Sequence, residues 1–309
     1  MNTGIIGAGS IGQLFFHDLL DDHGISPSFI DTRLPPDTPP AAITLAYHRD
    51  IGDPPCVPEH YQGIISPVSA AGKQDLIVIT AKAWQGKQIY RELASFLPAR
   101  IPVILLMNGM GSFEEAREML PNPIFSGITS RGAIHRGYTV FPRGNGPVYI
   151  GSPEHFPAGK EISRFSRAVR GTLCENIREL QLRKLLINAC INPLTALRQC
   201  RNAELAGTFR NETLTLFTEI YPVIKDQGLD LPEDAAQDLV FSVARETGNN
   251  LSSMAVDFQK RRPSELDYIL GYVLKVARSS DCELPMAERL YRTLKAKEKT
   301  FLFPESPKW

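Results

Sequence analysis

The chain has 309 residues, 43% hydrophobic and 22% charged, which is ordinary for a globular protein of about two domains. Lysine plus arginine and aspartate plus glutamate each total 34, and this zero net charge argues against a nucleic-acid partner but leaves room for a local anion site. We expect a cytoplasmic protein with no membrane partner and no metal site, because no apolar run approaches ~20 residues, no secretory signal is present, and the five cysteines are scattered.

The first half of the chain alternates short apolar runs with helical patterns. Strands are predicted at residues 3–6, 27–30, 75–80, 102–107, 123–128, 137–142 and 147–151, with a helix at residues 11–20. Several runs are apolar at every position, as buried strands of a parallel sheet require. The proline-rich stretch 35–58 reads as an irregular connection with one short strand at 43–47, and segment 130–137 shows no interpretable pattern. This half indicates an α/β fold with a doubly wound sheet of the Rossmann type.

From about residue 173 onward the hydrophobic period becomes helical. Helices are predicted at residues 205–228, 233–246 and 265–279, separated by glycine and proline. We therefore expect two domains, a nucleotide-binding Rossmann domain at 1–172 and an all-α substrate and catalytic domain at 173–309, with a loose tail after residue 301.

A glycine-rich loop follows the first predicted strand and opens the first helix. Such a loop lets the backbone approach a pyrophosphate closely, while the helix N-terminus supplies N–H donors. A bare turn without ligand is the weaker alternative, because the strand–loop–helix context is the one the motif requires. The predicted cofactor-binding residues of the loop are Gly7, Ala8, Gly9, Ser10, Ile11 and Gly12.

Charged residues that follow the strands predicted at 27–30 and 75–80 bear on the choice of cofactor. Asp31 would accept a hydrogen bond from the free 2′-hydroxyl of NAD, whereas Arg33 would pair with the 2′-phosphate of NADP. Lys82 adds a second cation, and two cations against one acid favour NADPH. Each could also be an ordinary solvated loop charge.

Lys184, Asn188 and Asn192 stand four residues apart within an otherwise apolar helical run. Residues at that spacing share one face, so a cation and two amides form one stripe, and a polar ligand would satisfy groups that are costly to bury. Partial burial lowers the pKa of a lysine and makes it a better acid near neutral pH, so Lys184 is the candidate proton donor for ketone reduction. Asn108, after the strand at 102–107, could hold the nicotinamide ribose or the substrate, or could be a turn residue.

Other polar residues have plain structural readings. Ser253 is explained by a helix N-cap, Asp257 by an ordinary helical acid, and Glu265 by a first-turn acid that complements the helix dipole. His135 is a weak rival to Lys184 as the acid.

Taken together, these segments resemble the ketopantoate reductase (2-dehydropantoate 2-reductase) family over essentially the full chain. The resemblance rests on the loop at 7–13, residues 80–85, the Asn-Gly-Met-Gly run from Asn108, the Lys184 helix, and residues 252–265. It implies NADPH-dependent reduction of ketopantoate to (R)-pantoate in pantothenate and coenzyme A biosynthesis, by a monomer or homodimer. The implied roles are general acid for Lys184, orientation of the substrate hydroxyl for Glu265, 2′-phosphate contact for Arg33 and Lys82, and substrate contact for Asn108, Asn188, Asn192 and Ser253.

Two alternatives stay open at this point. One is a reductase of the same architecture that acts on another 2-oxo acid or on an imine. The other is a non-catalytic NADPH-sensing module, which the complete set of polar residues around Lys184 argues against.

Overall fold

The computed structural model describes residues 1–48 and 57–301 of the chain. Cys56 and the tail after residue 301 lie outside these residues, so the expectation of a loose tail stays untested. The described residues divide into two compact units, one within Met1–Met107 and Ser112–Ile177, and one of Asn108–Gly111 with Arg178–Phe301. The expected boundary lay a few residues earlier, and nothing in the sequence indicated that Asn108–Gly111 is counted with the second unit.

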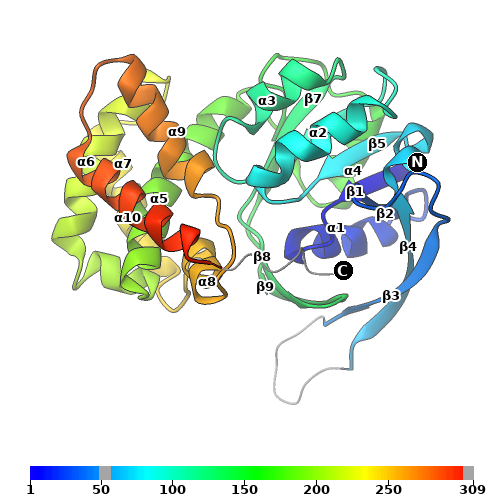
Figure 1. Cartoon of the computed structure of the whole chain (residues 1–309), viewed down its shortest axis with the longest axis horizontal. Coiled ribbons are helices and arrows are strands. Elements are labelled where there is room, and N and C mark those ends of the chain that lie inside the picture. Colours follow the sequence, from blue (N-terminus) through cyan, green and yellow to red (C-terminus); the bar gives the residue numbers. More distant parts are fainter. Residues whose placement is uncertain (49–56, 302–309) are drawn as a thin grey trace. The chain divides into compact units, whose positions relative to one another are not determined.

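The first unit contains a mixed sheet with a parallel centre (Figure 1). Its strands are β1 (Asn2–Ile6), β2 (Ser26–Asp31), β3 (Ala41–Tyr47), β4 (Glu59–Pro67), β5 (Leu76–Ile79), β6 (Val103–Leu105), β7 (Ile124–Thr129), β8 (Gly132–Arg136), β9 (Thr139–Gly144), β10 (Val148–Gly151) and β11 (Thr172–Leu173). The strand order among the described residues is β11-β10-β7-β6-β5-β1-β2-β4-β3-β9-β8.

The central six strands, β4-β2-β1-β5-β6-β7, pair in parallel. Numbered along the chain, this is the 3-2-1-4-5-6 order of the Rossmann fold. The flanking strands add antiparallel pairs, β3 with β4, β7 with β10, and β8 with β9. The expectation of a doubly wound α/β domain is confirmed.

Helices cover both faces of this sheet. They are α1 (Ser10–Leu20), α2 (Gly86–Ala94), α3 (Ser112–Met119) and α4 (Lys160–Ala168), with short 3-10 turns at Val68–Lys73 and Ala83–Gln85. Strand β5 shows how the core is divided, because alternate side chains of a strand point to opposite faces. Leu76 and Val78 pack with Phe15 of α1 and Phe165 of α4, whereas Ile77 and Ile79 pack with residues of α2 and α3.

The second unit is helical, as expected. Its helices are α5 (Ile177–Arg198), α6 (Arg210–Asp226), α7 (Glu233–Glu246), α8 (Ser253–Gln259), α9 (Leu266–Ser279) and α10 (Pro285–Lys299). One hydrophobic cluster joins them, including Leu186 of α5, Phe217 of α6, Val240 of α7 and Leu270 of α9. No helix among the described residues combines the length and apolar character that a membrane span needs.

Three local predictions were incomplete or wrong. The helix expected from residue 205 begins at Arg210, because Asn202–Ala206 forms a 3-10 turn. The stretch 35–58 carries the longer strand β3, which pairs with the unpredicted β4. Segment 130–137 contains β8, whose residues are mostly half-exposed and which is held by pairing with β9. These strands lack a clear period-2 pattern, so their pairing partners rather than their own sequence determine them.

Candidate active site

The glycine-rich loop joins β1 to α1, as predicted from the sequence. Gly7 adopts φ +110°, and a Cβ there would lie 2.6 Å from the Ala81 nitrogen. A Cβ on Gly12 would lie 1.9 Å from the Gly7 carbonyl oxygen. These two glycines are thus required by the tight turn and by the approach of the helix to the loop.

Gly9 differs from its neighbours in the same loop. A Cβ added to it would meet nothing within 4 Å, so the protein's own packing does not require glycine there. Gly9 is also the N-cap of α1, where no side chain caps the first turn and no acidic residue lies in that turn. Open space beside a glycine and an uncapped helix N-terminus fit a pyrophosphate, which needs close backbone approach and N–H donors.

The predicted cofactor residues Arg33 and Lys82 follow β2 and β5, the two strands that pair in parallel with β1 on either side. In the register of the sheet, Ile6 of β1 is opposite Ile30 of β2 and Ile79 of β5. The glycine loop, Arg33 and Lys82 each follow the carboxyl end of one of these strands, so the three segments leave the same edge of the sheet. Ligands bind at that edge in doubly wound folds.

Asp31 and Arg33, whose charges gave conflicting cues, form one ion pair. Arg33 Nε donates to Asp31 Oδ1 at 2.8 Å and its NH2 group to Asp31 Oδ2 at 2.7 Å, while the Arg33 backbone N–H also donates to Oδ1 at 3.0 Å. The Asp31 side chain is 13% exposed and that of Arg33 is 31% exposed. Because both oxygens of Asp31 accept from Arg33, its negative charge is largely offset within the protein.

Lys184 lies on α5 and is half-buried, with Asn188 and Asn192 at the next two positions of its face. Lys184 Nζ donates to Asn108 Oδ1 at 2.9 Å. Its neighbour Arg183 points elsewhere, because its side chain is 39% exposed and Nε pairs with Glu179 Oε1 at 2.7 Å.

Asn108 also reaches the second predicted acid. Its Nδ2 donates to Glu265 Oε2 at 3.0 Å, so one amide links Lys184 to Glu265. Glu265 is 4% exposed and is the N-cap residue of α9, not a member of its first turn. Its side chain makes no capping hydrogen bond, which sets it apart from a simple dipole-complementing acid.

Desolvation lowers the pKa of Lys184 to about 8, against the opposing effect of the Glu265 carboxylate. A lysine with this pKa is still largely protonated at neutral pH but gives up its proton far more readily than one in water. The cluster of Lys184, Asn108 and Glu265 therefore combines an ammonium of lowered pKa with an amide and a carboxylate that are hydrogen-bonded in series.

The two amides farther along α5 add hydrogen-bonding capacity. Asn192 is 7% exposed and Asn188 is half-buried. Within residues 1–48 and 57–301, neither side-chain amide has a hydrogen-bond partner. An amide offers both donors and an acceptor to a polar ligand, so this part of the stripe is suited to bind one.

Ser253, Asp257 and His135 have different surroundings. The N-cap of α8 is Ser252, not Ser253 as the simpler reading proposed, and the Ser252 hydroxyl accepts from the Ala255 N–H at 3.1 Å. Ser253 is the first helical residue and is exposed, while Asp257 is buried in the same helix. His135 belongs to the first unit, where its Nδ1 lies 3.4 Å from Gln13 Nε2.

Sequence reasoning missed two contacts that shape this region. The Thr195 hydroxyl on α5 lies 2.6 Å from the Ser252 hydroxyl, and both residues are buried, so α8 is attached to the helix that carries the amide stripe. Thr195 stands on the Lys184 face by spacing, but nothing in the sequence identified its partner. The link through Asn108 was missed for the same reason, because it joins residues 76 and 157 positions apart.

Comparison with known proteins covers both units. The family described as "Ketopantoate reductase PanE/ApbA" matches residues 3–155, and "Ketopantoate reductase PanE/ApbA C terminal" matches residues 176–298. A 2-dehydropantoate 2-reductase of Salmonella typhimurium is 36% identical over 234 residues, covering 74% of this chain and 76% of the relative. One of Listeria innocua is 29% identical over 320 residues, covering 96% of this chain and 97% of the relative.

Solved structures agree with this assignment. A probable 2-dehydropantoate 2-reductase of Bacillus subtilis is 26% identical with a TM-score of 0.74, covering 96% of this chain and 100% of that one. A D-mandelate dehydrogenase solved with NADH and anilino(oxo)acetate has a TM-score of 0.82 at 23% identity, covering 98% and 100%, which shows a shared fold. By its family profiles and relatives, the chain is an oxidoreductase that belongs to the ketopantoate reductase family.

Proposed function

We propose that the protein reduces 2-dehydropantoate (ketopantoate) to (R)-pantoate with NADPH, on the route to pantothenate and coenzyme A. The observation that carries the proposal is the hydrogen-bonded series Lys184–Asn108–Glu265, in which desolvation lowers the lysine pKa to about 8. The relatives named 2-dehydropantoate 2-reductase support the choice of substrate.

The glycine loop supports dinucleotide binding, because the space beside Gly9 is open and the α1 N-terminus has no side-chain cap. When bound, NADPH supplies the hydride for the ketone carbon. Arg33 and Lys82 are the proposed partners of the 2′-phosphate. The pairing of Asp31 with Arg33 favours NADPH over NADH, since the carboxylate that would otherwise recognise a free 2′-hydroxyl already accepts from the guanidinium.

Lys184 is the proposed general acid. As the ketone becomes an alkoxide, negative charge develops on its oxygen, and the Lys184 ammonium can both stabilise that charge and transfer a proton to it. Asn108 accepts from Lys184 and thereby directs one N–H of the ammonium. A lowered pKa reduces the free energy needed for this transfer.

Glu265 and the amides are the proposed substrate contacts. A carboxylate can accept from the 4-hydroxyl of ketopantoate, and the Asn108 Nδ2 amide holds Glu265 by donating to its Oε2. Asn188 and Asn192 can donate to the substrate carboxylate without adding charge. Ser253, exposed at the start of α8, is a further proposed contact.

The decisive experiment follows the absorbance of NADPH with purified protein and ketopantoate, then repeats it with NADH. Lys184→Ala should reduce turnover by roughly 10²–10⁴, whereas Arg183→Ala, which alters the neighbouring exposed cation, should leave turnover near that of the unmodified protein. Activity on ketopantoate no better than on 3,3-dimethyl-2-oxobutanoate, which lacks the hydroxyl, would instead indicate a reductase of another 2-oxo acid.

A further inference from the structure

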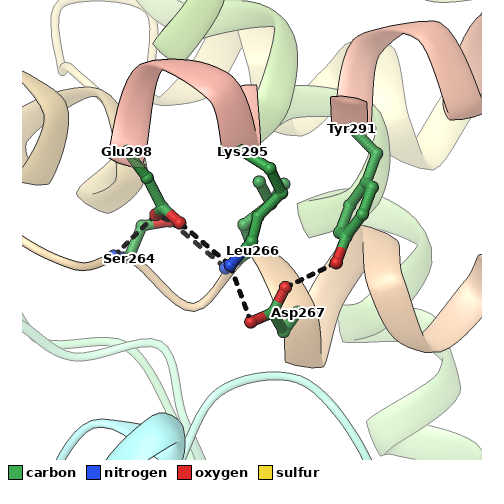
Figure 2. A network of polar contacts seen from close by, with 6 residues as sticks. All are labelled: Ser264, Leu266, Asp267, Tyr291, Lys295 and Glu298. Atoms are coloured by element: carbon green, nitrogen blue, oxygen red, sulfur yellow. Dashed lines mark hydrogen bonds and ion pairs between the residues drawn. The ribbon is translucent and has the colours of Figure 1, made fainter. Parts of the chain in front are cut away.

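A buried acid on the last helix holds the segment that carries Glu265. Glu298 of α10 is 6% exposed. Its Oε1 accepts from both the backbone N–H of Ser264 at 3.0 Å and the Ser264 hydroxyl at 2.5 Å (Figure 2). Ser264 stands in the link between α8 and α9, immediately before Glu265. Glu298 thus takes two hydrogen bonds from the residue that precedes Glu265.

The residue after Glu265 is attached to the same point. The Ser264 hydroxyl, while donating to Glu298, accepts from the Leu266 backbone N–H at 3.2 Å. Leu266 is fully buried in the core of the second unit. Glu265 is therefore flanked on both sides by residues held in place through one hydroxyl and one carboxylate, and its backbone has little freedom to turn.

Lys295 and Tyr291 extend the network along α10. Lys295 Nζ lies 3.3 Å from Glu298 Oε2 and 2.9 Å from Asp267 Oδ2. The Tyr291 hydroxyl donates to Asp267 Oδ1 at 2.7 Å (Figure 2). Desolvation, together with Asp267, raises the pKa of Tyr291 to about 12, so this donor keeps its proton across the physiological range. The first turn of α9 is consequently fastened to α10 at two points.

A contribution to the stability of the fold does not by itself explain why the carboxylate of Glu298 is buried in this network. Burying a carboxylate has a desolvation cost that pairing with a lysine offsets only in part, and apolar residues of similar volume often stabilise a fold as well or better. The network also fixes the orientation of a side chain, because several hydrogen bonds at one place restrict the backbone to a single conformation. The residue whose direction they define is Glu265.

We propose that Glu298 is a positioning residue, which acts through Ser264 to aim the Glu265 carboxylate at the hydroxyl of the substrate. This inference rests on the proposed function, in which Glu265 recognises that hydroxyl. Glu298 touches neither Asn108 nor Lys184 in any hydrogen bond recorded for the described residues, so its effect travels through the backbone of residues 264–266.

The test compares two substrates in a graded series of variants of the full chain. Glu298→Ala removes both contacts, Ser264→Ala removes the hydroxyl alone, and Glu298→Gln keeps an acceptor for Ser264 but not the charge paired with Lys295. Each is assayed for kcat/KM on ketopantoate and on 3,3-dimethyl-2-oxobutanoate. Glu288→Ala is the matched control, because Glu288 lies on the same helix but pairs at the surface with Arg292 at 2.8 Å.

We expect Ser264→Ala and Glu298→Ala to lower kcat/KM for ketopantoate by roughly tenfold to a hundredfold, with much smaller changes for the analogue. The losses should not add in the double variant, and Glu298→Gln should recover part of the activity. NADPH affinity should not change. If Glu298→Ala does not fold, Ser264→Ala decides alone, since it deletes a single buried oxygen.

Equal losses on both substrates, or no loss on either, in a folded Ser264→Ala protein would overturn the positioning role. Failure of the proposed function would look different. In that case Glu265→Gln itself would lower kcat/KM equally for the two substrates. That result would reject the proposed role of Glu265 and, with it, the positioning role of Glu298. A Glu265→Gln protein that discriminates between the substrates, beside a Ser264→Ala protein that does not, rejects the positioning role alone.

Discussion

Asn108 precedes Lys184 by 76 residues in the chain, and its side-chain oxygen accepts a hydrogen bond of 2.9 Å from Lys184 Nζ. The other end of the same amide donates to Glu265 at 3.0 Å. The Asn108 amide thus accepts from the cation and donates to the anion at the same time. The Glu265 carboxylate raises the pKa of Lys184, but desolvation lowers it by more.

The first prediction concerns the pH dependence of reduction. Lys184 must be protonated to act as the acid, and its pKa is lowered to about 8. We expect kcat/KM for ketopantoate to be level below about pH 8 and to fall above it, approaching tenfold per pH unit. The measurement is a pH profile of NADPH oxidation at constant ionic strength.

The residual activity of Lys184→Ala supplies the control. It should lack the decline near pH 8, whereas Arg183→Ala should retain it. A Lys184→Ala protein with the same declining limb as the unmodified protein would assign that limb to another group.

The second prediction concerns stability. The pKa of Lys184 is 10.5 in the unfolded chain and about 8 in the folded protein, so the folded state binds this proton more weakly. Below about pH 8 the Lys184 amine is charged in both the folded and the unfolded state, and burying it lowers the free energy of unfolding by the full amount. Between about pH 8 and pH 10.5 the unfolded state binds more protons than the folded state, so the free energy of unfolding rises with pH and this destabilisation is relieved.

Lys184→Met should therefore stabilise the protein at neutral pH, by on the order of 1 kcal/mol once the solvent access of this half-buried side chain is taken into account. The gain should shrink toward pH 10. Urea unfolding of the two proteins at both pH values measures this difference, and a gain that grows with pH would contradict the assigned direction of the shift.

The third prediction separates two glycines of one loop. Gly9→Ala places a methyl group in open space, so the fold should lose at most about 1 kcal/mol, whereas binding of NADPH should weaken about tenfold or more, or ~1.4 kcal/mol. Gly12→Ala places Cβ 1.9 Å from the Gly7 carbonyl oxygen and should destabilise the unit itself by roughly 1–3 kcal/mol.

Thermal unfolding with and without NADPH distinguishes the two effects. Gly9→Ala should unfold near the temperature of the unmodified protein but gain little from added NADPH. If instead its stabilisation by NADPH equals that of the unmodified protein, the space beside Gly9 is not where the dinucleotide binds.

The fourth prediction concerns the choice between NADPH and NADH. Arg33→Ala removes a charged donor to the 2′-phosphate. Because a hydrogen bond to a charged group contributes about 1.5–3 kcal/mol, KM for NADPH should rise by roughly tenfold to a hundredfold. It also releases Asp31, both of whose oxygens now accept from Arg33, so KM for NADH should fall or stay constant.

Adding Asp31→Asn to Arg33→Ala should abolish any gain with NADH. Arg164→Ala is a matched control in the same unit. The Arg164 NH2 group pairs with Asp22 Oδ1 at a distance of 2.8 Å, and neither residue belongs to the glycine loop. Equal losses of Arg33→Ala with both cofactors would reject the phosphate contact.

Local periodicity was sufficient where an element buries one whole face or both. The apolar strand β5 and the 3.6-residue stripe of α9 were predicted closely, and Gly7 and Gly9 between β1 and α1, with Gly12 in the first turn of α1, indicated the turn that they form. The strand β8 was not recognised, because its half-exposed residues carry no alternation and it depends on hydrogen bonds to β9.

What the sequence determined by itself is the chemistry available: a dinucleotide loop, a lysine with two amides on one helical face, and the family to which these belong. The spacing of residues along one helix or one loop is a local property, so it can be read from the chain. What only the tertiary structure decided is which distant groups meet these residues. Asn108 joins Lys184 to Glu265, and Glu298 holds Ser264, since such contacts depend on how helices pack and not on any residue's own neighbours in sequence.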